Sequence, residues 1–195
     1  MFLNQEHRAI IKKWFGVSRF VYNTTIKYLQ QPDTKADWKK IKTGILNDLP
    51  EWCKEVPYQI KSIAIKDACL AVKKAKGDFK TTGKIYKCKF RSRKNLIQSC
   101  YIPKSAVSEK GIYHTKLGKL KFAESLPKAF GDCRLVMAYG NYYLSMPIEE
   151  RQHKTDNQGR VVALDPGIRT FQTFFSETSF GEIGNGANLK VFELL

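Results

Sequence analysis

One carboxylate follows an apolar run near the C-terminal end of the sequence. Asp165 comes directly after residues 161–164 (VVAL) and directly before Pro166 and Gly167. Proline favours extended geometry in the residue before it, and glycine leaves open space beside the carboxylate. A charge there needs a cation, backbone donors or a metal ion. Nucleases that use two Mg²⁺ ions gather several such oxygen ligands. Asp165 is therefore a candidate catalytic and metal-binding residue, and the alternative is an Asp that caps a hairpin turn.

The strongest charge imbalance lies in the middle of the sequence. The chain has a formal net charge of +16, and residues 71–130 carry 16 Lys and Arg against 3 Asp and Glu, whereas residues 131–195 carry 6 against 8. Clustered cations repel one another unless a polyanion neutralises them, so this block predicts nucleic-acid binding, with a solvated surface as the alternative. The cations interleaved with Tyr86 and Phe90 are the candidate phosphate contacts: Lys84, Lys87, Lys89, Arg91, Arg93 and Lys94.

Cysteine and histidine usage excludes several classes of site. The five cysteines are spread out without a C-x-x-C pair, and the three histidines are scattered. We therefore expect reduced thiols in an intracellular protein, cytoplasmic or nuclear, and no zinc site. No apolar run approaches the ~20 residues of a membrane span, and no secretory signal is recognisable. The sequence gives no sign of a small-molecule substrate.

Helical periodicity dominates residues 1–76. Apolar residues recur at helical spacing over residues 4–30, with Asn4 as N-cap, and Gly16 and Ser18 predict a helix-turn-helix or a kink in the middle. Two further amphipathic helices are expected over residues 35–49 and from residue 58 to residue 76, where Gly77 follows. We interpret residues 1–76 as a helical region.

Short apolar runs separated by turn residues replace this pattern over residues 77–150. The alternation in residues 84–90 (KIYKCKF) predicts a strand, and a hairpin is expected around Gly140 and Asn141. Residues 151–159 are polar and are interpreted as a linker, after which residues 160–195 begin with VVALD, expected to form a buried central strand. The predicted fold class is therefore α+β, with a helical region, a basic β-rich region and a C-terminal hairpin unit.

Two separated motifs resemble a known family. Residues 14–23 (WFGVSRFVYN) and the stretch ALDPGIRTFQTFF resemble the TnpB/OrfB family of transposon-encoded proteins, and the wording DPGIRTF is similar to its Fanzor relatives. The resemblance implies an RNA-guided DNA endonuclease. It would have a helical recognition lobe, an OB-like wedge barrel, and an RNase H-like (RuvC) domain in which Asp165 is the first of three acidic Mg²⁺ ligands. Guide RNA and DNA would be its partners, contacted through Arg19, Tyr22 and Asn23.

The chain also departs from this family's pattern. This sequence has no counterpart to the strand that the family places before the first helix. It also has none to three later features of the family: a catalytic Glu, a four-cysteine zinc element and a final catalytic Asp. The resemblance therefore implies a protein truncated at both ends and inactive in cleavage by itself. Two other classes remain open. One is an ATPase of the actin or sugar-kinase type, in which a D-x-G hairpin faces nucleotide phosphates, and the other is a non-catalytic basic RNA-binding module.

Overall fold

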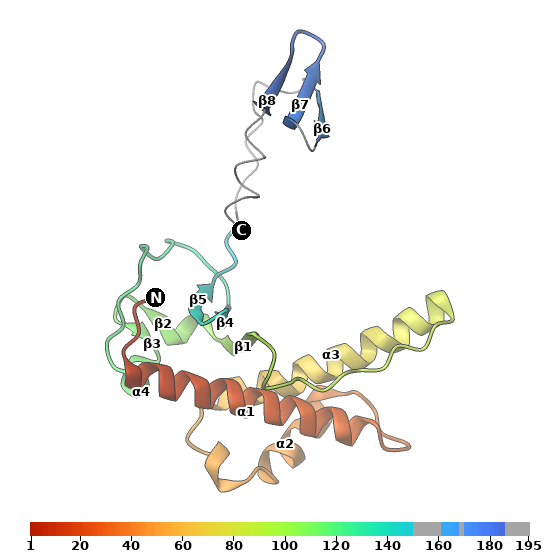
Figure 1. Cartoon of the computed structure of the whole chain (residues 1–195). Coiled ribbons are helices and arrows are strands. Elements are labelled where there is room, and N and C mark those ends of the chain that lie inside the picture. The colour runs from red at the N-terminus through yellow and green to blue at the C-terminus, as the bar shows by residue number, and fades with distance from the viewer. Residues whose placement is uncertain (150–160, 168–169, 186–195) are drawn as a thin grey trace. The chain divides into compact units, whose positions relative to one another are not determined.

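The computed structural model describes residues 1–149, 161–167 and 170–185. The chain forms two compact units, Met1–Glu149 and Glu150–Leu195. The three long helices come before the antiparallel sheets along the chain, which is consistent with the α+β prediction (Figure 1). The predicted linker 151–159 lies outside the described residues.

The first helix, α1 (Gln5–Leu29), is continuous. Its N-terminus has the predicted cap: the His7 N–H donates to Asn4 Oδ1 at 2.8 Å, and the Asn4 N–H donates to His7 Nδ1 at 3.4 Å. Of the two alternatives predicted at Gly16 and Ser18, the helix-turn-helix is wrong, because residues 5–29 form one helix. A glycine inside a helix costs only about 1 kcal/mol, whereas α1 buries an apolar face along its length, and Ser18 itself is 3% exposed within that face.

Two further helices follow α1 and pack against each other, and the second of them packs against α1. The helix α2 (Trp38–Asn47) begins at Asp37, whose side chain accepts from the Lys39 N–H, and Trp38 Nε1 donates to the Ser62 carbonyl at 2.9 Å. The helix α3 (Tyr58–Thr82) continues through Gly77, where we expected it to end, and stops at Gly83. Gly83 adopts the left-handed conformation with φ 67° that commonly terminates helices. The boundary predicted at residue 77 therefore falls within α3.

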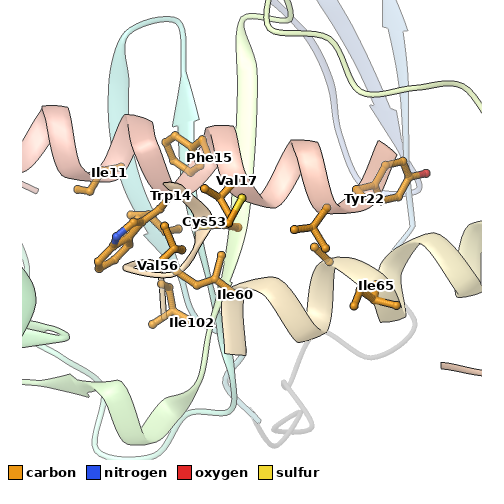
Figure 2. Close-up of a cluster of buried hydrophobic side chains, with 14 of the residues drawn as sticks. Ile11, Trp14, Phe15, Val17, Tyr22, Cys53, Val56, Ile60, Ile65 and Ile102 are labelled. Atoms are coloured by element: carbon orange, nitrogen blue, oxygen red, sulfur yellow. The ribbon is translucent and has the colours of Figure 1, made fainter. Parts of the chain in front are cut away.

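The core of the first unit joins helices and sheet. The α1 residues Ile11, Trp14 and Val17 belong to one buried cluster with Val56, Ile60 and Ile102 of the first strand (Figure 2). The short 3-10 helix η1 (Glu51–Cys53) adds the fully buried Cys53 to this cluster. The helices α1 and α3 both contact β1 (Ile97–Ile102). The helical and β-rich regions therefore share one core.

The β-rich region contains two small antiparallel sheets. One has the order β1-β4-β5, with β4 (Cys133–Ala138) and β5 (Asn141–Ser145), and the other pairs β2 (Val107–Ser108) with β3 (Gly111–Ile112). The predicted hairpin is present, but its two turn residues are Tyr139 and Gly140, with φ of 49° and 81°, because Ala138 pairs with Asn141. Shorter helical elements, η2 (Lys104–Ala106) and α4 (His114–Leu117), flank β2 and β3. Within residues 1–149 these sheets do not close into the predicted OB-like barrel.

Residues 83–96 do not form the strand predicted from their alternating pattern. They leave α3 at Gly83 and run back to β1 without regular secondary structure (Figure 1). Of the apolar residues in the pattern only Cys88 packs against the core, while Ile85 is 86% exposed. An alternating pattern forms a strand only where a neighbouring strand can pair with it. Among the residues that the structure describes, this segment has no such neighbour, so its alternation reflects a few core contacts among many exposed cations.

The second unit is a three-stranded antiparallel meander of order β6-β7-β8. Its strands are β6 (Val162–Pro166), β7 (Thr170–Ser176) and β8 (Phe180–Asn185). We expected VVALD to be a buried central strand, but β6 lies at the edge of this sheet and Val162 and Leu164 are 51% and 54% exposed. The central position belongs to β7, which pairs with both neighbours.

Candidate nucleic-acid interface

The second half of α3 and the segment after it form a basic arm, which we define as residues 73–90. Buried side chains in α3 end at Cys69, and the rest of the helix extends away from the core (Figure 1). The arm carries one acid, Asp78, and seven exposed lysines: Lys73, Lys74, Lys76, Lys80, Lys84, Lys87 and Lys89. Three of these seven were singled out from the sequence. The other four lie on the part of α3 that projects, which only the structure reveals.

Apolar side chains are interleaved with these cations and are also open to solvent. Phe79, Tyr86 and Phe90 have exposed fractions of 49%, 51% and 54%. Proteins that bind single-stranded nucleic acid combine a positive surface for the backbone with aromatic side chains on which bases stack. The composition of the basic arm matches this combination.

The base of the arm is fixed to α1 through Asn23 and Arg91. The Arg91 N–H donates to Asn23 Oδ1 at 2.8 Å, and Asn23 Nδ2 donates to the Arg91 carbonyl at 2.9 Å. Both polar groups of the Asn23 amide therefore serve the fold. The structure places this predicted nucleic-acid contact in an internal hydrogen-bond pair.

Tyr22 contacts Arg91 of the same loop through its ring. Its side chain is 7% exposed, and the Arg91 guanidinium carbon lies 3.9 Å from the centre of its ring. Burial raises the pKa of the Tyr22 phenol, and the nearby Arg91 charge opposes that shift. Because the ring is covered, the predicted stacking of Tyr22 on nucleic acid is not available in this arrangement, and the ring instead holds Arg91.

Asp67 on α3 joins the loop to the sheet. It accepts two hydrogen bonds from Arg134 of β4, with Nη1 and Nη2 each 2.8 Å from a carboxylate oxygen, and a longer one from Arg91 Nη2 at 3.4 Å. The Asp67 side chain is 15% exposed. Such forked pairs are stronger than neutral hydrogen bonds and fix orientation. Sequence reasoning missed Asp67 and Arg134, because a single Asp on a helix and a single Arg on a strand give no local signal.

Arg19 and Arg93 lie on the open side of this base. Arg19 Nη1 donates to Gln98 Oε1 at 3.0 Å. The pKa of the Arg19 guanidinium is lowered, mainly by its partial burial and to a smaller extent by repulsion from Arg93. Arg93 and Lys94 are exposed. In the described part of the chain none of these three cations forms an ion pair. Their charges are therefore open to an anionic partner.

Asp165 lies near the end of β6, as predicted, and it is exposed. It pairs across the sheet with Thr173, which pairs in turn with Glu182 of β8. Side chains directly opposite one another in antiparallel strands share a face, so the two carboxylates lie on one face with Thr173 between them. The described residues contain no group of three His, Cys, Asp or Glu side chains that could hold a metal ion. Asp165 and Glu182 therefore do not make a metal site by themselves.

All five cysteines are free thiols in the structure. Among the described residues, no helix has both the length and the apolar character that crossing a membrane requires.

The N-terminal segment of the chain is similar to a known domain family. Residues 2–31 match the model of the helix-turn-helix domain of OrfB proteins from IS605-type elements. No curated protein matches the chain. The matched segment contains Arg19, Tyr22 and Asn23, and it coincides with α1 and the residues just before it. Within this segment the structure has a single helix, α1. The match makes residues 2–31 similar to a domain of OrfB/TnpB-type transposases, and it supports nucleic-acid binding as the role of this segment.

Proposed function

We propose that the chain is a TnpB-like, transposon-associated protein that binds guide RNA and DNA. The observation that carries the proposal is the basic arm, residues 73–90, held at its base by the Asn23–Arg91 pair. Seven exposed lysines and three exposed aromatic side chains on one projecting element suit a phosphate backbone with accessible bases. The family match of residues 2–31 supports the same class of ligand.

The charge of the basic arm is largely unneutralised within the arm. Its seven lysines stand against one acid, Asp78, so the lysines repel one another. Phosphates bound along the arm would remove this repulsion and release condensed counterions. A binding role therefore explains a charge distribution that costs stability in the free protein.

For the second unit we propose a more limited role. Asp165 would supply one carboxylate of a RuvC-type, Mg²⁺-dependent nuclease site in an RNase H-like domain. Mg²⁺ would stabilise the developing charge on the attacking and leaving oxygens of a phosphodiester. The exposed carboxylate at the end of β6 fits an oxygen ligand, but a two-ion site needs several carboxylates, and the described residues do not gather them. The activity proposed for this chain by itself is therefore binding, without cleavage.

The salt dependence of binding tests the proposal. Fluorescently labelled RNA and DNA oligonucleotides are titrated with the full chain at ionic strengths from ~50 to ~200 mM. If six or more phosphates are neutralised, the association constant should fall about a thousandfold or more over this range. An association constant that does not change with salt would contradict the proposal.

One substitution distinguishes the metal-ligand role proposed for Asp165 from nucleic-acid binding. Asp165→Asn should leave the dissociation constant for either oligonucleotide unchanged, because the basic arm belongs to the other unit. Any Mg²⁺-dependent cleavage shown by an assembly that contains this chain should be lost. Cleavage that persists in the Asp165→Asn variant would contradict the metal-ligand role while leaving the binding proposal intact.

A further inference from the structure

A groove beside the base of the basic arm is lined by aromatic side chains and cations from three separate elements. It has a volume of about 740 Å³. The helix α1 contributes Arg19, Phe20 and Lys27, η1 contributes Trp52, and the loop after α3 contributes Phe90. We call it the aromatic groove. Its volume lies within the range of small-ligand sites.

The aromatic side chains of this groove are unusually open to solvent for residues of their size. Trp52 is 46% exposed and Phe90 is 54% exposed. The Phe20 ring supports Trp52, with ring centres 5.1 Å apart and planes inclined by 58°. Tryptophan commonly buries most of its surface. An indole held by one ring and open on its remaining surface is a platform for a flat, apolar ligand.

The walls of the groove are fixed independently of any ligand. Phe90 precedes Arg91, whose backbone is held by both hydrogen bonds of the Asn23 amide. Gly16 lies in the groove lining, and a Cβ placed there would meet only the Arg19 guanidinium, at 3.9 Å. The ligand-free groove is thus already formed, so a ligand would not have to order it.

The charges around the groove select among flat ligands. Arg19 and Lys27 both line it and form no ion pair with the described residues, and Arg93 lies close enough to Arg19 to perturb it. No acidic side chain lines the groove. A flat ring that arrives attached to a phosphate satisfies both features, whereas an apolar peptide would leave the cations without partners.

We propose that the aromatic groove binds one unpaired nucleobase of a single-stranded segment, stacked against Trp52, with the adjoining phosphate facing Arg19 and Lys27. This inference rests on the proposed function, because the same strand would continue onto the basic arm. It adds a preference for unpaired over paired nucleic acid. A base within a duplex is covered by its neighbours on both faces and cannot enter.

Twelve-nucleotide oligomers of uridine and of thymidine, together with an abasic oligomer of equal length and charge, provide the test. The groove should favour both base-bearing oligomers over the abasic one, and a difference between uridine and thymidine oligomers tells RNA from DNA as the source of the base. Binding should quench tryptophan fluorescence, because Trp52 is the exposed indole among three, while Trp14 is 2% exposed and Trp38 is bonded through Nε1 to Ser62.

Substitutions at Trp52 separate stacking from charge. Trp52→Leu should weaken binding of the base-bearing oligomers at least about fivefold, the lower end of the cost of losing one base stack, and leave abasic binding unchanged. Trp52→Phe should retain most of the affinity and lose the quenching. Tyr143→Leu, which alters another exposed aromatic residue, on β5, is the matched control and should change neither. Circular dichroism verifies that each variant is folded.

Equal affinity for base-bearing and abasic oligomers, or full affinity in Trp52→Leu, would overturn the stacking site. If the oligomers still bound with steep salt dependence, only the base-binding site in the groove would be contradicted, and the proposed function would be supported. If none of the oligomers bound with salt dependence, both proposals would be contradicted.

Discussion

The side-chain amide of Asn23 is paired with the backbone of Arg91, 68 residues later in the chain, through two hydrogen bonds of 2.9 and 2.8 Å. This pair closes the loop that carries the basic arm back to the core. Within residues 2–31, which match the helix-turn-helix domain, the Asn23 side chain therefore serves the fold through both of its polar atoms.

Asn23→Ala should lower the free energy of unfolding by about 1–3 kcal/mol, because it leaves a partly buried backbone N–H and carbonyl without partners. Urea denaturation followed by circular dichroism measures the loss. Asn47→Ala, at an exposed position near the end of α2, is the control and should change stability by less than about 0.5 kcal/mol. Unchanged stability together with weakened RNA binding would show instead that Asn23 contacts the ligand directly.

Asp67→Asn should destabilise the first unit by about 1.5–3 kcal/mol, the range for hydrogen bonds to charged groups. The substitution keeps the shape of the side chain but removes the charge that faces Arg134 and Arg91. Asp78→Asn on the same helix changes the net charge equally, and none of the ion pairs of the described residues involves Asp78. Similar stabilities for the two variants would argue against the Asp67 junction as a structural element.

Two glycines in α3 should respond to alanine with opposite signs. Gly77 lies within the helix with open space around the position of a Cβ, so Gly77→Ala should stabilise by about 0.5–1 kcal/mol. Gly83 has φ +67°, so Gly83→Ala should destabilise by about 1 kcal/mol. Thermal unfolding of the two variants tests the length of α3. If Gly77→Ala destabilised the protein, the helix would end where the sequence pattern suggested.

Stability should decline at alkaline pH partly through Tyr101. Burial and a hydrogen bond to Asp132 raise the pKa of this phenol to about 12, above its unfolded value of ~10. The folded state therefore holds the proton more tightly, and this contribution, complete below pH ~10, is lost as pH rises toward 12. As pH rises from ~10 to ~12, the free energy of unfolding of Tyr101→Phe should fall less than that of the unsubstituted protein, measured by urea denaturation at each pH. Parallel pH profiles for the two proteins would contradict the raised pKa of Tyr101.

Much of the fold follows from the sequence because local signals agreed with the tertiary contacts. Asn4 predicted the start of α1, the apolar spacing predicted three helices, and Gly140 predicted the β4–β5 hairpin to within one residue. One error concerns the end of α3. We expected this helix to end at Gly77, but the left-handed backbone that terminates it lies at Gly83.

The candidate site was predicted less completely, for a different physical reason. Charge and aromatic content indicated residues 84–94, but alternation alone could not show that this segment lacks a partner strand. The grouping of Trp52 with Phe20 and Phe90 depends on contacts among three elements. Likewise, Tyr22 and Asn23 have the side chains of nucleic-acid contacts, and only the position of Arg91 shows that both face inward.

The central claim is that the basic arm neutralises phosphates, and the salt slope of an arm variant tests it most directly. The triple variant Lys84→Gln, Lys87→Gln and Lys89→Gln removes three exposed charges from the arm. Lys12→Gln, Lys39→Gln and Lys40→Gln remove three exposed charges from α1 and α2 and form the matched control. Plots of the logarithm of the association constant against that of salt concentration are compared for a single-stranded RNA. We expect the arm variant to lower the slope by about 2–3 and the control to leave it nearly unchanged. Equal slopes for the arm variant and the control would contradict the claim.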